Sequence, residues 1–139
     1  MDLVDLTKES FRRMFDEGDL AFVDETIGVD GVDHQHPESE VGEDFRAHLK
    51  DVITKMRTAF PDLHFELEHV LADEDIVAAN SMMTGTHSAP FAIGPFAAVP
   101  AAGNRIAVRH MHFFRYRDGR CVDLWHVWDT AGLMGQLRG

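Results

Sequence analysis

Residues 105–128 read RIAVRHMHFFRYRDGRCVDLWHVW, and their pattern is the strongest indication of the fold. Apolar and polar residues alternate along it, and Asp118-Gly119 interrupts the alternation, which is typical of two antiparallel strands joined by a tight turn. Successive side chains of a strand point to opposite faces of its sheet. His110 and His112 therefore share one face with apolar residues, and most of the arginines share the other.

The length of the turn decides whether His126 joins these two histidines. A two-residue turn, Asp118-Gly119, places His126 on the opposite face of the sheet. A three-residue turn, Arg117-Asp118-Gly119, with Gly119 in the left-handed conformation, sets His110 opposite His126. Both turns are compatible with the residues.

We prefer the three-residue turn, because it gives the second strand a consistent inner face. It sets His112 opposite Leu124, places Leu124 and Trp128 on the side of the aromatic Phe114, and leaves Asp123 on the side of the arginines. Three imidazoles then lie on a face that is otherwise apolar. One buried histidine is commonly a satisfied core residue, but three together need partners, a site or a metal. The pattern therefore predicts a ligand pocket, which is typically apolar with a few convergent polar groups.

The rest of the chain places helices before this hairpin and two further strands beside it. Apolar residues recur at helical spacing over 4–15, 20–27 and 45–60, and these runs end at Gly18, Gly28 and Pro61. Residues 29–42 predict a strand fragment and a loop, 63–71 and 76–86 predict strands, and 133–137 a last short helix. Helices followed by antiparallel strands predict one α+β domain over residues 1–139, with the helices on one face of a curved sheet. His48 falls on a polar position of the third helix and is predicted to be solvated.

Composition excludes several classes of protein. The chain has 139 residues, and 24 acidic against 13 basic residues give a formal net charge of -11. This charge argues against a nucleic-acid-binding surface and against an anionic membrane surface. No apolar stretch approaches the roughly 20 residues of a membrane span, and the acidic start of the chain is unlike a secretory signal. We therefore expect a soluble, cytoplasmic protein with no nucleic-acid or membrane partner.

Four segments of the chain carry a family resemblance. They are Val32-Asp33-His34, Ala59-Phe60-Pro61-Asp62-Leu63, Thr84-Gly85-Thr86-His87, and WHVWDTAGLM over residues 125–134. Together they resemble the SnoaL-like polyketide cyclase, or ester cyclase, family of the nuclear-transport-factor-two-like superfamily, over nearly the whole chain. The resemblance implies a cone-shaped α+β barrel, in which a strongly curved antiparallel sheet wraps over helices and encloses an apolar cavity.

The resemblance also implies a chemistry. Cyclases of this kind close the last ring of an aromatic polyketide by an intramolecular aldol reaction without a cofactor, using an aspartate of the last strand and a histidine of the preceding one. His112 matches that histidine, His110 matches a neighbouring polar pocket residue, and His126 stands where the aspartate would be. An imidazole suits proton transfer at neutral pH at least as well as a carboxylate. We therefore predict a cofactor-independent cyclase of secondary metabolism, with these three histidines as catalytic residues and no metal.

The expected partner is an aromatic or polyketide-like small molecule. Its binding residues are predicted to be His34, Asp33, His87, Phe91, Phe96, Phe114, Trp128 and Met82. Residues 90–102 carry no charge and contain too many turn formers for a core strand. We expect Phe91, Ile93 and Phe96 to form a lid over the cavity mouth, and a dimer interface is the alternative. A homodimer is expected through the outer face of the sheet.

Other functions remain open on the sequence alone. A hydroxylase or an epoxide-opening enzyme can have the same fold, and Asp33 and Asp129 are the carboxylates that epoxide opening would use. The three histidines could hold a divalent metal ion, although no acidic residue lies in an evident position behind them. A non-catalytic small-molecule-binding module is the third possibility, because this fold also serves as a scaffold.

Overall fold

The structure is a computed structural model that describes residues 2–35 and 44–139, so part of the predicted loop over residues 29–42 lies outside the described residues. Its elements, in chain order, are α1 (Leu3–Ser10), a π-helical turn (Phe11–Asp16), α2 (Leu20–Thr26), β1 (Ile27–Asp33), α3 (Phe45–Ala59), β2 (His64–Asp73), β3 (Ile76–Thr86), a 3-10 turn (Gly94–Ala98), β4 (Arg105–Arg117), β5 (Arg120–Trp128) and α4 (Thr130–Arg138). Among the described helices, none has the length and apolar character that a membrane crossing requires.

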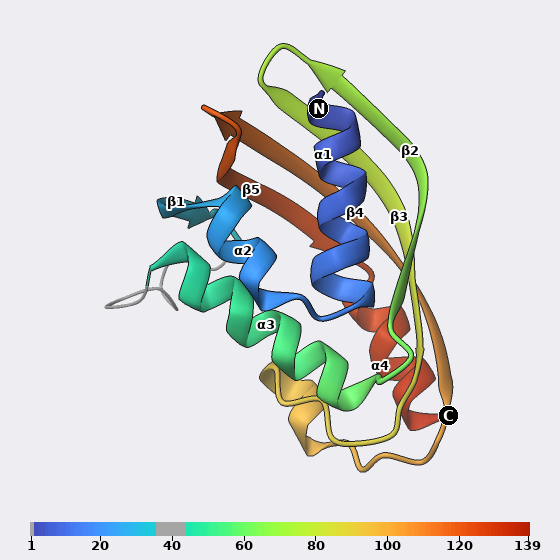
Figure 1. The fold of residues 1–139 in the computed structure, drawn as a ribbon. Helices are drawn as coiled ribbons and strands as arrows, with labels where there is room; N and C mark the ends of the chain where they lie inside the picture. The colour runs from blue at the N-terminus through green and yellow to red at the C-terminus, as the bar shows by residue number, and fades with distance from the viewer. Residues whose placement is uncertain (1, 36–43) are drawn as a thin grey trace.

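The five strands form one sheet in the order β1-β5-β4-β3-β2. The pairs from β2 to β5 are antiparallel, as predicted, but β1 joins the edge of β5 in parallel, so the sheet is mixed. The sheet curves strongly, and α1, α2 and α3 lie on its concave side (Figure 1). The predicted α+β cone is therefore confirmed, with the parallel edge strand as the difference.

Aspartates fix where the α-helices begin. Asp2, Asp19, Asp44 and Asp129 each precede a helix, and each side chain accepts a hydrogen bond from a backbone N–H in the first turn. Such caps satisfy donors that the helix itself leaves unpaired. The apolar stripe of α3 then packs toward the sheet, with Phe45, Ile53 and Met56 buried. The helix thus stands opposite β4 and β5 across the interior of the cone.

The β4–β5 turn differs from the prediction, although the predicted inner face is correct. Arg117 pairs with Arg120, so the turn has two residues, and Asp118 and Gly119 have φ of 51° and 74°. Positive φ at both central residues is what a tight type I′ hairpin turn requires. A bulge between Arg115 and Tyr116 on β4 and their partners on β5 then shifts the register.

Because of this bulge, the side chain of His126 lies on the inner face of the sheet. His112 lies opposite His126, and His110 lies opposite Trp128, instead of the predicted pairing of His110 with His126. A two-residue turn without the bulge would have turned His126 outward. The predicted side of the sheet is therefore right, whereas the predicted turn length and partners are wrong.

Candidate active site

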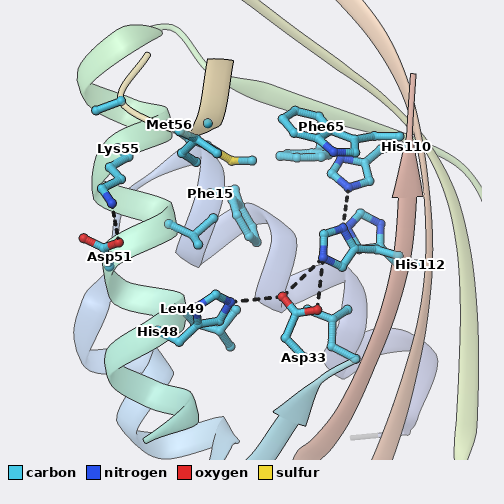
Figure 2. A pocket seen from close by; sticks show the side chains of 17 residues that line it. Phe15, Asp33, His48, Leu49, Asp51, Lys55, Met56, Phe65, His110 and His112 are labelled. Atoms are coloured by element: carbon cyan, nitrogen blue, oxygen red, sulfur yellow. Dashed lines mark hydrogen bonds and ion pairs between the residues drawn. The ribbon is translucent and has the colours of Figure 1, made fainter. Parts of the chain in front are cut away.

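The interior of the cone contains a cavity of about 410 Å³. On one side it is bounded by α3, through residues that include His48, Leu49, Val52 and Met56, and on the other by His110 and His112 of β4 and by His126 and Trp128 of β5. Figure 2 shows His110, His112 and Asp33 facing α3 across this space. The wall is mainly apolar and aromatic, which is the usual composition of a ligand site. Its polar groups come from both sides: Asp33 and the three imidazoles from the strands, and His48, Asp51 and Lys55 from α3.

The three inner histidines lie against one another. The rings of His110 and His112 stack with centroids 4.1 Å apart, and the ring of His126 lies 5.4 Å from His110 and 5.7 Å from His112. Nε2 of His110 is 3.2 Å from Nδ1 of His126, within hydrogen-bond distance. One ring nitrogen from each of the three lies within 4.8 Å of the others, so the trio could also hold a metal ion.

Asp33, at the end of β1, anchors this cluster. Its carboxylate accepts hydrogen bonds from Nε2 of His126 at 3.2 Å, from Nε2 of His48 at 3.0 Å and from the backbone N–H of Gln35 at 3.1 Å. Burial by itself would raise the pKa of Asp33, but the hydrogen bonds from His126 and His48 outweigh burial and hold the pKa well below its usual range. Asp33 is therefore a buried anion at neutral pH.

The anionic state of Asp33 fixes the proton on His126. A carboxylate only accepts hydrogen bonds, so Nε2 of His126 is the protonated nitrogen of this pair. Nδ1 of His126 then faces Nε2 of His110. The result is a hydrogen-bonded chain from Asp33 through His126 to His110, which orients the central imidazole as a carboxylate does in catalytic triads.

Burial keeps the other two imidazoles neutral. Desolvation, followed by the nearby imidazole of His126, lowers the pKa of His110 to about 3. Desolvation also lowers the pKa of His112 well below its ordinary value, with the neighbouring His110 and His126 adding to the effect. At neutral pH both rings are therefore hydrogen-bonding groups without charge.

The pairing of β1 with β5 and the small size of Gly31 explain how Asp33 reaches this position. In the parallel register of β1, Asp33 lies beside Leu124 of β5. The side chain of the next residue, His34, points to the opposite face of the sheet. Gly31 allows β1 to pass close to α3, because a Cβ at this position would collide with the ring of Phe45. The side chain of Gln35 accepts a hydrogen bond from the backbone N–H of His126 at 2.6 Å, which ties the end of β1 to β5.

Two of the predicted binding residues, Asp33 and Trp128, line the cavity. Two others face away from it. His34 stacks on Trp125 and pairs with Asp123 at 2.9 Å, because it follows Asp33 and so emerges on the other side of the sheet. Met82 lies opposite Arg109 in register, whereas the neighbouring Met83 is buried on the inner side.

The predicted lid is instead part of the core. Phe91 and Phe96 are buried, stack on each other and contact the ring of Trp128 from behind the cavity wall. His87 is fully buried beside Phe60. Of the predicted lid residues, Ile93 lines the cavity. A run of uncharged residues signals burial, but it does not distinguish a mobile cover from a fixed wall.

Phe114 lies deeper than predicted, in a small neighbouring cavity of about 50 Å³.

His48 was predicted to be solvated, but it is buried and paired with Asp33. Its sequence position could have revealed this. His48 precedes Val52 by four residues and Met56 by eight, and residues at these spacings lie on one face of a helix.

The protein is thus an α+β cone with a cluster of one aspartate and several histidines at an apolar cavity. The sequence model of the SnoaL-like polyketide cyclase family matches residues 5–137, and the chain belongs to this family. The predicted family and the nuclear-transport-factor-two-like fold are thus confirmed. Membership supports an enzymatic role of the cyclase type. No curated protein sequence matches the chain.

Solved structures agree with the fold. The chain is similar to TsrD from Streptomyces laurentii, with a TM-score of 0.82 and 22% identity over 99% of this chain and 97% of that one. It is similar to IdmH from Streptomyces antibioticus, described as a candidate polyketide cyclase, with a TM-score of 0.76 and 27% identity over 98% and 99%. It is also similar to AclR from Streptomyces galilaeus, described as a candidate hydroxylase, with a TM-score of 0.77 and 24% identity over 98% and 86%.

Proposed function

We propose that this chain is a cofactor-independent cyclase, which closes a ring of a polyketide-type intermediate by an intramolecular aldol reaction. In this proposal it works in the cytoplasm, in secondary metabolism. The observation that carries the proposal is the chain of hydrogen bonds from the buried Asp33 through His126 to His110, at the wall of an apolar cavity. Family membership and the similarity to IdmH support the class of substrate.

His126 is the general base in this proposal. Its Nε2–H is held by the Asp33 carboxylate, so the lone pair is on Nδ1, and the anion behind the ring stabilises the imidazolium that forms. Nδ1 takes a proton from the carbon next to a ketone of the substrate. Nε2–H of His110, 3.2 Å away, donates to this lone pair in the free chain. In this proposal the bound substrate takes the place of that hydrogen bond, and His110 serves as a positioning residue for the ring of His126.

His112 polarises the acceptor carbonyl. Its ring lines the cavity, and of its two nitrogens Nδ1 is the one that is buried without a partner among the described residues. Nε2 is therefore the nitrogen that can donate a hydrogen bond to a substrate oxygen. Because burial holds the pKa of His112 low, the ring acts as a neutral donor, as suits a carbonyl that becomes an alkoxide.

The proposed step is balanced without a cofactor. The enolate carbon attacks the acceptor carbonyl carbon, one carbon–carbon bond forms, and the carbonyl π bond breaks to give an alkoxide. The proton held on Nδ1 of His126 returns to the alkoxide, so the enzyme ends in its starting state. A cavity of about 410 Å³ with Phe15, Phe65 and Trp128 in its wall suits a folded aromatic chain.

The experiment is a ring-closure assay with a panel of aromatic β-ketone substrates, followed by mass spectrometry and NMR of the products. We expect a cyclised product of unchanged or dehydrated mass. His126→Ala and His112→Ala should lower turnover by about two to four orders of magnitude, while the outer variant His34→Ala retains it. Full turnover in both inner variants would refute the proposed roles of these two histidines. A product that has gained oxygen would identify a hydroxylase instead.

A further inference from the structure

The same three imidazoles form a donor set for a metal ion. We propose that His110, His112 and His126 bind a single divalent transition-metal ion, with Zn²⁺ as the expected occupant. One ring nitrogen from each lies within 4.8 Å of the others, and all three residues border the cavity. The proposal concerns binding alone and does not depend on the proposed function. A metal ion bound to these nitrogens would prevent them from transferring protons, so metal binding competes with the proton transfer proposed above.

The spacing of the nitrogens is close to what zinc requires. Zinc–nitrogen bonds of about 2.0–2.1 Å in a tetrahedron place the ligand nitrogens about 3.3 Å apart. Nε2 of His110 and Nδ1 of His126 are already 3.2 Å apart. His112 lies directly opposite His126 in the sheet and two residues from His110, and its ligand nitrogen lies within 4.8 Å of theirs. The fourth position then faces the cavity and is open to water.

A carboxylate stands behind one of the ligands. Histidines that bind metal usually donate their other ring N–H to a carboxylate or carbonyl, which fixes the tautomer and strengthens the ligand. Asp33 accepts such a bond from Nε2 of His126, so Nδ1 is the nitrogen that turns toward a metal. His48 holds Asp33 from the other side. The sequence predicted Asp33 as a binding residue but did not place it behind His126, because the two lie 93 residues apart along the chain.

His112 gives an independent indication. It is buried, and its Nδ1 has no hydrogen-bond partner among the described residues. Buried polar groups of native proteins are nearly always paired, so an imidazole in this position calls for a partner. The ring of His112 therefore lies beside the other two imidazoles with hydrogen-bonding capacity that the described residues do not use. Three nitrogen donors without a carboxylate in direct reach favour zinc and its transition-metal neighbours over magnesium or calcium.

The test uses the whole chain without a histidine tag, stripped with a chelator and dialysed. Cobalt(II) is titrated in and followed by visible absorption, and Zn²⁺ binding is measured by calorimetry. We expect one ion per chain, with the absorption bands of tetrahedral cobalt, which zinc displaces. Zn²⁺ should also raise the melting temperature, because it binds the folded chain preferentially.

Matched variants decide where the ion binds. Asp33→Asn should weaken Zn²⁺ binding by about 10–100-fold, and His112→Phe should weaken it further, because a ligand is lost. The outer variants His34→Phe and His64→Phe should leave it unchanged. Near-ultraviolet circular dichroism identifies variants that are folded, and His126→Gln replaces any inner variant that is not. Unchanged binding in the folded inner variants, equal losses in the outer ones, or no binding at millimolar Zn²⁺ would each overturn the proposal.

Discussion

Histidine–aspartate pairs occur on both faces of the sheet, and the two faces give them different properties. On the inner face, His126 meets Asp33, whose side chain is 3% exposed. On the outer face, His34 meets Asp123, and its ring is stacked on Trp125 with a side chain that is 36% exposed. Water screens the outer pair, whereas the inner pair lies in a low dielectric, where a carboxylate acts strongly on an imidazole.

Burial, and not residue type, separates the candidate site from the surface. Both pairs consist of the same two residue types, supplied by the same two segments of the chain. The inner pair continues into His110 and the cavity, whereas the outer pair ends in solvent. The chemistry of each pair therefore depends on the side of the sheet on which its residues emerge.

The largest expected difference between the two faces is in stability. Asp33→Ala removes hydrogen bonds to the buried imidazole of His48 and the partly buried imidazole of His126, and should lower the free energy of unfolding by about 3–5 kcal/mol. Asp123→Ala removes a partly exposed partner and should cost at most about 1 kcal/mol. Urea denaturation of both variants measures the difference. Equal losses would show that the inner pair does not anchor the structure.

The wall of the cavity can be compared with the core behind it. Phe91→Ala removes a fully buried ring and should cost about 3–5 kcal/mol of stability. Ile93→Ala, at the cavity surface, should cost only about 1 kcal/mol and should mainly raise KM. Thermal denaturation and substrate titration measure both effects. A Phe91→Ala protein with unchanged stability and a raised KM would instead support the predicted lid.

Acidification should lower the stability of the folded chain through the buried His110 and His112 and raise it through the exposed His64. Burial lowers the pKa of His110 to about 3 and that of His112 well below its ordinary value. Below about pH 6.5 the unfolded chain therefore binds protons that the folded chain does not, and each residue removes up to about 1.4 kcal/mol of stability per pH unit. His112→Phe should flatten the decline in unfolding free energy between about pH 6.5 and 4.5, as measured by urea denaturation.

The exposed His64 provides the control of opposite sign. Hydrogen bonds to Asp16 and then Glu66 raise its pKa, so its contribution to stability is fully present below about pH 6.5 and is lost as the pH rises through the folded value. His64→Gln should therefore make the decline on acidification steeper. A steeper decline in His112→Phe, or a flatter one in His64→Gln, would contradict the assigned shifts.

The smallest effect concerns the outer face itself. Met111, Phe113 and Val127 are 49%, 53% and 64% exposed there, and the homodimer expected through this face stays a prediction. Light scattering at micromolar concentration should give the mass of two chains. Phe113→Ser should shift the equilibrium toward one chain, and the inner variant His112→Ala should not. A monomeric unaltered chain would rule the dimer out.

The sequence determined the fold class, the family and two of the inner histidines. Alternation along residues 105–128 is a local property, because each side chain of a strand takes the face opposite to its neighbour. His110 and His112 therefore share a face whatever the rest of the chain does. The helical runs are local for the same reason, and the structure has helices in each of them, with aspartate caps at the starts of the α-helices.

The surroundings of these histidines depend on the tertiary structure. The bulge that returns His126 to the inner face depends on how β4 and β5 pair, and the sequence alone allowed two registers. Asp33 reaches His126 because β1 adds to β5 in parallel, and His48 reaches Asp33 because α3 packs across the cone. These contacts join residues that are far apart in the chain. They depend on packing and burial, so no local sequence pattern predicts them.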